Sequence, residues 1–110
     1  MRVVITQLNE PPAIPAQIAG GLVAMPGGQT GAGLLPAAIN IVTLGSAGQG
    51  RKLNAGIARQ EVFARFGFDL LVYPTEGTMI EGYGVNVPVT VPSGVNATFT
   101  FDGVSLWLVS

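Results

Sequence analysis

The chain has 110 residues, a formal net charge of −1, and neither cysteine nor histidine. Asp, Glu, Lys and Arg make up 10% of it, against about 25% in an ordinary soluble domain, and its mean hydropathy is +0.51. The lack of cysteine and histidine excludes disulfides, thiol nucleophiles, Ser–His–Asp triads and the common zinc sites. The length predicts one domain over residues 1–110.

So few charges imply that much of the surface is apolar. No run approaches the ~18 apolar residues of a membrane-spanning helix, so we expect no membrane partner. The charge balance lacks the basic footprint of nucleic-acid binding. No apolar core ending in a cleavage site follows Arg2, so no signal peptide is expected. We therefore expect copies of the chain, or a protein partner, to cover this surface.

The first 36 residues divide into a short strand and a long irregular segment. Residues 2–8 are rich in β-branched side chains and predict a first strand. Residues 9–36 hold repeated prolines and glycines and predict an extended Pro/Gly-rich arm. A free loop would leave the apolar side chains of this arm in water, so we expect the arm to lie across a surface. Its candidate interface residues are Ile14, Ile18, Leu22, Val23, Met25, Leu34 and Leu35.

Residues 37–110 predict the core of a sandwich. Strands are expected, in chain order, at 38–44, 51–53, 61–66, 68–73, 79–80, 85–91, 97–101 and 104–109. They recur about every 8–12 residues with Gly or Pro between them, which is typical of a sandwich or barrel. The sequence therefore predicts an all-β, jelly-roll-like sandwich of about eight short antiparallel strands.

Several single residues indicate where the predicted strands end or turn and which residues share a face. Pro74 has no N–H for a ladder and should end the strand before it, and Gly77 then supplies a turn. Gly67, between two predicted strands, suits a hairpin or a β-bulge. In the strand at 38–44, Asn40 and Val42 share one face.

The last two strands carry a strong hairpin signal. Residues 102–103 are Asp-Gly, a dipeptide that favours a tight turn between antiparallel strands. In the strand that follows, Val104, Leu106 and Leu108 lie on one face and Trp107 on the other.

The sequence offers little catalytic chemistry. Its six acids are Glu10, Glu61, Asp69, Glu76, Glu81 and Asp102, and most occupy expected turns or outward positions, which favours solvated side chains over paired catalytic carboxylates. They form no Asp-x-Asp cluster for calcium. Residues 27–33 are Gly-rich but lack the Gly-Lys-Ser/Thr ending of a phosphate loop. We therefore predict no enzymatic activity, cofactor or metal.

Aromatic residues extend the candidate interface. Tyr83 and Trp107, with Tyr73, could form a sugar-binding patch, although packing in a core or an interface is the commoner use of such side chains. We include Tyr83 and Trp107 among the candidate interface residues.

The order of motifs from residue 33 onward is distinctive. In sequence it contains Ile39-Asn40-Ile41-Val42-Thr43, Leu53, Val72-Tyr73-Pro74, Gly77, Ile80, Gly82, Gly94, Ala97-Thr98-Phe99 and Trp107. This order resembles a module of tailed-bacteriophage structural proteins, found in capsid cement or decoration proteins and in head- or tail-fibre proteins. The chain departs from the module at Asn54, where Leu-Pro is usual, and at residues 66–68, where Phe-Gly-Phe replaces a polar Asn-x-Gly.

The resemblance implies a jelly-roll subunit that clamps a capsid lattice. We therefore expect a structural virion protein, a decoration subunit that stabilises the outer surface of the phage head. Its expected partners are the major capsid protein and copies of itself, as a homotrimer rather than a dimer. The alternative is a head- or tail-fibre module that binds host surface glycans through Tyr83, Trp107 and nearby loops.

Overall fold

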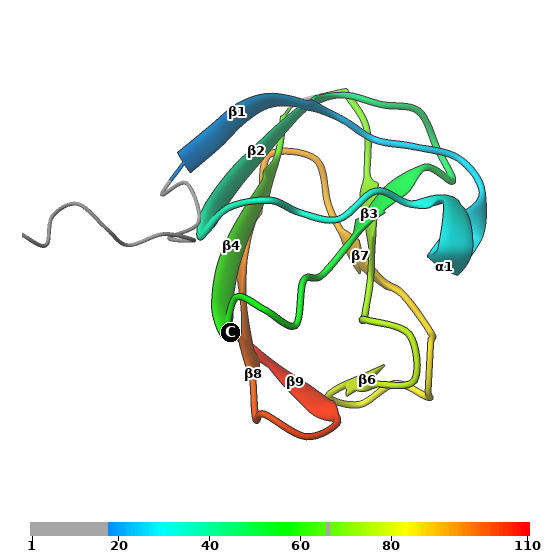
Figure 1. The fold of residues 1–110 in the computed structure, drawn as a ribbon. Helices are drawn as coiled ribbons and strands as arrows, with labels where there is room; N and C mark the ends of the chain where they lie inside the picture. Colours follow the sequence, from blue (N-terminus) through cyan, green and yellow to red (C-terminus); the bar gives the residue numbers. More distant parts are fainter. Residues whose placement is uncertain (1–17, 66) are drawn as a thin grey trace, which may run out of the picture.

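The computed structural model describes residues 18–65 and 67–110, which form two β-sheets packed against each other (Figure 1). The larger sheet has the order β1 (Ile18–Val23), β2 (Ile39–Leu44), β4 (Arg59–Ala64), β8 (Asn96–Phe101), β9 (Leu106–Val109) and β6 (Met79–Ile80). The smaller sheet has the order β3 (Gly50–Lys52), β5 (Leu70–Tyr73) and β7 (Val89–Val91). One helical turn, α1 (Gly28–Gly31), joins β1 to β2 in this part of the chain. The predicted all-β class is confirmed.

Two predictions fall where the structure gives no description, namely the first strand at residues 2–8 and the candidate interface residue Ile14. Within residues 18–65 and 67–110, no helix is long and apolar enough to cross a membrane.

Both sheets are mixed, so the prediction of antiparallel strands was wrong for much of the fold. The pairs β1–β2, β2–β4, β3–β5 and β6–β9 are parallel, whereas β4–β8, β5–β7 and β8–β9 are antiparallel. Parallel neighbours need a crossover connection rather than a tight turn. The chain accordingly passes from β4 in the larger sheet to β5 in the smaller one. Gly67, with a φ of 109°, lies in this crossover and not in the hairpin or β-bulge that the sequence suggested, because β4 and β5 belong to different sheets.

The core lies between the two sheets and centres on Trp107. This side chain is fully buried and stacks on the ring of Phe101, with ring centroids 4.6 Å apart. Its Nε1 donates a hydrogen bond to Oγ1 of Thr78 at 3.3 Å, which satisfies the one polar atom of the indole. Trp107 and Leu108 face opposite ways, as the alternation predicted, but Trp107 is the one that faces inward. Trp107 is therefore a core residue and not the interface residue that we expected.

Two buried amide side chains hold the segment before β2 inside the sandwich. Nε2 of Gln60 donates to the carbonyl oxygens of Leu35 and Ala37, at 2.9 Å each, and its Oε1 accepts the N–H of Asn54 at 2.8 Å. Asn40 bonds both main-chain groups of Ala37, through Oδ1 at 3.0 Å and Nδ2 at 2.7 Å. Because both amides are fully buried, these bonds prevent the cost of burying unpaired polar atoms.

Residues 18–36 belong to the sandwich, so the prediction of an extended arm was wrong for them. β1 extends the larger sheet beside β2, and Met25 exchanges two main-chain hydrogen bonds with Gly50, at 2.9 Å each. Leu35 is fully buried in the core, so it is not the interface residue that we expected. Prolines and glycines break the local pattern here, but the partners of this segment lie in strands further along the chain.

The hairpin between β8 and β9 forms as predicted, but β9 begins at Leu106 rather than Val104, so that residues 102–105 make the connection. Oδ1 of Asp102 accepts the main-chain N–H groups of Val104, Ser105 and Leu106, at 2.7, 2.9 and 3.1 Å. These bonds favour the ionised carboxylate and hold the pKa of Asp102 below its ordinary value. The side chain thereby fixes the turn that the Asp-Gly dipeptide indicated.

The stretch after β5 also follows the prediction. Pro74 comes directly after the end of β5, Gly77 turns the chain with a φ of 84°, and β6 follows. The strand expected at 85–91 is shorter, since only Val89–Val91 forms β7. Residues 85–87 instead belong to an exposed loop.

A Gln60→Leu variant should lose about 3 kcal/mol of unfolding free energy, because the carbonyl oxygen of Leu35 and the N–H of Asn54 would lose their partner, whereas that of Ala37 keeps its bond from Asn40. Chemical denaturation of wild type and variant measures this difference. The matched control is Gln49→Leu, which removes one solvent-exposed bond to Ser46 and should cost about 0.5 kcal/mol or less. Equal losses in the two variants would contradict the role assigned to Gln60.

The Asp102 turn predicts a pH dependence. A carboxylate whose pKa is depressed in the folded state adds stability above the unfolded pKa, and this is lost as pH falls through the folded pKa. The stability advantage of wild type over Asp102→Asn should therefore be constant near neutral pH and shrink as pH falls below the ordinary value of 3.8. Paired denaturation curves at several pH values test this, and an advantage that does not change with pH would contradict it.

Candidate interaction surfaces

The described residues enclose no pocket, and no three acidic side chains among them come together as a metal site would need. The surface is notable instead for exposed apolar side chains. Those with more than a third of their surface exposed are Ile18, Val23, Met25, Leu34, Leu44, Tyr83, Val85, Val87, Val95, Val104 and Leu108. Interaction surfaces built from such residues are the candidate functional sites.

The first surface, which we call the Arg51 patch, consists of Arg51 with Val23, Met25 and Leu34. Arg51 lies in β3, and its guanidinium donates to the carbonyl oxygens of Val23 at 3.1 Å and Leu34 at 2.7 Å. Its Nη1 also lies 3.6 Å from the sulfur of Met25. The three apolar side chains are 38–48% exposed. The fold thus brings three predicted interface residues together around one arginine.

Among the described residues, Arg51 has no carboxylate partner. The ion pair found there joins Nζ of Lys52 to the carboxylate of Glu76, 3.0 Å apart. The Nε of Arg51 is buried without an acceptor among these residues. Burial lowers the pKa of Arg51, because desolvation disfavours the charged form. By contrast, the hydrogen bond from Lys52 lowers the pKa of the Glu76 carboxyl. The Arg51 patch is therefore apolar around a partly desolvated cation.

The second surface is the loop at residues 81–87, between β6 and β7, in which every residue is exposed. It presents Tyr83, Val85 and Val87, which are 45, 52 and 42% exposed. Glu81 adds a carboxylate at its start. Such a run of exposed apolar side chains is typical of a contact surface.

Main-chain hydrogen bonds hold this loop in place. The N–H of Tyr83 donates to the carbonyl oxygen of Ile80 at 2.8 Å, and the N–H of Asn86 to that of Thr78 at 2.9 Å. The Asn86 side chain accepts the N–H of Gly77 at 2.8 Å, although its own φ is 64°, a value that few residues other than glycine adopt. The exposed apolar side chains thus stand on a fixed backbone.

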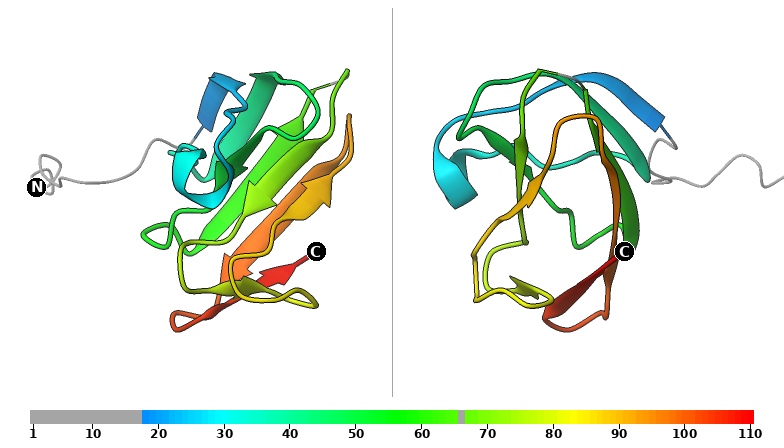
Figure 2. Two further views of the ribbon diagram at one scale, coloured as in Figure 1. Left: turned by 90° about the vertical axis from the view of Figure 1, so that its right-hand side faces the viewer. Right: turned by 180° about the vertical axis from the view of Figure 1, so that it is seen from behind.

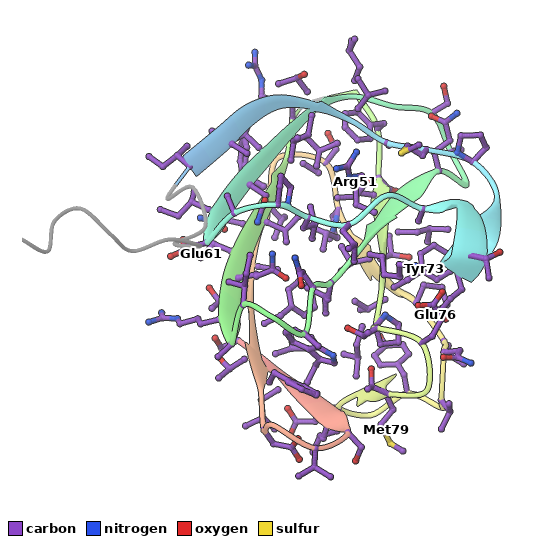
Figure 3. The ribbon with its side chains drawn as sticks, viewed as in Figure 1. Arg51, Glu61, Tyr73, Glu76 and Met79 are labelled. Atoms are coloured by element: carbon purple, nitrogen blue, oxygen red, sulfur yellow. The ribbon has the colours of Figure 1, made fainter. Side chains whose placement is uncertain are left out.

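The third surface, which we call the outer face, is the side of the larger sheet that points away from the core. Because Val42, Val62 and Trp107 are buried, their strand neighbours point outward. The parallel register of β2 and β4 sets Ile41 beside Phe63 and Ile39 beside Glu61. Figure 3 shows Glu61 on this side, away from the core. The apolar members of the outer face are Ile39, Ile41, Phe63, Leu106 and Leu108, all at least partly exposed.

The sequence-predicted interface residues are thus distributed over different environments. Ile18 is 60% exposed at the start of β1, whereas Leu22 is partly buried against the core. Sequence reasoning did not select Arg51 or the outer face. Arg51 could have been selected, because an arginine stands out as a candidate functional residue in a chain with so few charges. The outer face was hidden, because alternation alone does not say that Asn40, rather than Ile41, points inward.

Comparison with known proteins leaves the family open, since no family model, curated protein or solved structure matches this chain.

An Arg51→Met variant should lose about 1–2 kcal/mol of unfolding free energy, because the carbonyl oxygens of Val23 and Leu34 lose their charged donor while the aliphatic stem remains. The neighbouring Lys52→Met variant, which removes a pair with the exposed Glu76 carboxylate, should lose less. Urea denaturation compares the two. An Arg51→Met variant as stable as wild type would show that Arg51 does not fix these segments.

Proposed function

We propose that this chain is a structural virion protein, a jelly-roll-like decoration subunit that binds the outer surface of an assembled phage head. Its partners would be the major capsid protein and further copies of itself, with a trimer expected. The observation that carries the proposal is the cluster of Ile39, Ile41, Phe63, Leu106 and Leu108 on the outer face, on a chain in which only 10% of residues are charged. The order of motifs that resembles phage decoration proteins supports it independently.

The outer face suits binding to a protein lattice. The solvent side of a sheet in a monomeric domain is commonly polar. Here β8 follows that rule with Asn96, Thr98 and Thr100, whereas β2, β4 and β9 add Ile, Phe and Leu to the same side. Complete burial of an exposed side chain of this kind contributes about 1.5–3 kcal/mol, and the side chains here, most of them already half-buried, contribute part of that. The pairing of β2, β4, β8 and β9 keeps these side chains in fixed register. The sheet therefore offers a contact surface that needs little reorganisation.

The proposed action is stabilisation by mass action. A subunit that binds the assembled lattice, and not its dissociated components, lowers the free energy of the assembled state by its binding free energy. A stable contact of this kind would bury about 1,600 Å² in total. No bond is made or broken, so the mechanism needs no catalytic group.

A glycan-binding fibre module is the second candidate, and the exposure of Tyr83 on a fixed loop favours it. Trp107, its expected second aromatic platform, is buried and cannot stack on a sugar in this fold. The candidate therefore depends on Tyr83 and its neighbours. Glycan-array binding by the isolated protein that is lost in Tyr83→Ala would favour this function over decoration.

The double variant Ile41→Thr/Phe63→Thr should bind purified shells at least about tenfold more weakly than wild type, because loss of about 1.4 kcal/mol changes a dissociation constant tenfold. The shells are those of the phage that encodes the chain, stripped of this protein, and gel densitometry measures occupancy. The control is Val104→Thr, at a side chain that is 80% exposed in the β8–β9 turn and is not a member of the outer face. Unchanged occupancy in the double variant would refute binding through the outer face.

A further inference from the structure

We propose that copies of this chain join head to tail, with the loop at residues 81–87 of one subunit docked on the Arg51 patch of the next. The inference deepens the proposed function, which expects self-association, by naming the two surfaces that meet.

Charge is the first argument. The guanidinium of Arg51 meets only two carbonyl oxygens and a thioether among the described residues. Glu81 is exposed at the start of the loop, and no Lys or Arg of the described chain lies within ion-pair distance of it. A carboxylate is the strongest partner for a guanidinium, because the two form charge-assisted hydrogen bonds. Each surface therefore has the charge that the other lacks.

Apolar complementarity is the second argument. Val23, Met25 and Leu34 lie beside Arg51, while the loop that begins at Glu81 presents Tyr83 and two valines. Tyrosine, methionine and arginine are enriched in the cores of protein interfaces. The flexible thioether of Met25 can adapt to the ring of Tyr83. Docking would thus place one ion pair inside a ring of apolar contacts that excludes water.

The geometry makes this contact intermolecular. Figure 3 places Arg51 in the upper part of the molecule and Met79 at its lower end, and Val85 of the loop forms a β-bridge with Met79. Both views of Figure 2 likewise separate β1 from β6 at opposite ends of the sandwich. The loop therefore cannot reach the Arg51 patch of its own subunit. It can reach the patch of a second copy.

Two different surfaces that bind each other form a heterologous interface, which gives a ring where the rotation between subunits closes and an open filament where it does not. The hydrogen bonds that hold Tyr83 and Asn86 fix the loop before docking, so little conformational entropy is lost on association. A closed ring would use the loop and the patch of every subunit.

The test uses two variants of the full chain, Leu34→Asp in the patch and Val85→Asp in the loop. Both side chains are about half exposed, at 48% and 52%, so the fold should tolerate either change. Light scattering coupled to size-exclusion chromatography should find an oligomer for wild type and a monomer for each variant alone. An equal mixture should form a dimer, because the intact loop of Leu34→Asp fits the intact patch of Val85→Asp.

Val104→Asp, on neither surface, is the control and should keep the wild-type mass, while circular dichroism verifies that all variants are folded. A monomeric wild type, oligomeric single variants or a mixture that stays monomeric would each overturn the inference. The outcome is separable from the proposed function. If the wild type binds shells as a monomer, only the head-to-tail contact is overturned. If it forms the oligomer but does not bind shells, only the decoration role is overturned.

Discussion

The fold depends on the buried amide of Gln60. This side chain extends from β4 into the core and bonds the main chain on both sides of Pro36, at Leu35 and Ala37, and again at Asn54. Without these bonds, burial of this irregular segment would be costly. Its carbonyl oxygens would lose their hydrogen bonds to water and gain no partner inside the protein. With them, Leu35 is available as a core residue and the segment before β2 becomes an internal part of the sandwich.

At the surface, Arg51 binds main-chain carbonyl oxygens in the same way as Gln60 does in the core. Its guanidinium also bonds two carbonyl oxygens of the irregular region, those of Val23 and Leu34. Side chains from the regular strands β3 and β4 thus add to the main-chain bonds by which this Pro/Gly-rich region pairs with β2 and β3. A consequence is that Val23, Met25 and Leu34 have defined positions on the surface, which a free arm would not give them.

The arrangement of the sheets decides which apolar residues remain for partners. The core takes Trp107, Phe99 and Leu35, and the pleat then directs Ile41 and Phe63 outward. The outer face carries Arg59 and Glu61 as well, but five Ile, Leu and Phe side chains remain exposed or half-buried there. With the apolar side chains of the Arg51 patch and of the loop at 81–87, they are the physical basis for proposing a protein that works by contact with other subunits.

The all-β class, the end of β5 at Pro74, the turn at Gly77 and the Asp102 hairpin could be predicted from the sequence, because each follows from short-range properties of the main chain. Tertiary structure alone decided the rest. The mixed strand pairing, the burial of Leu35 and Trp107, and the inward orientation of Asn40 depend on contacts between residues far apart in the chain. Local patterns hold no information on these contacts, since either face of an alternating strand can be the one that packs.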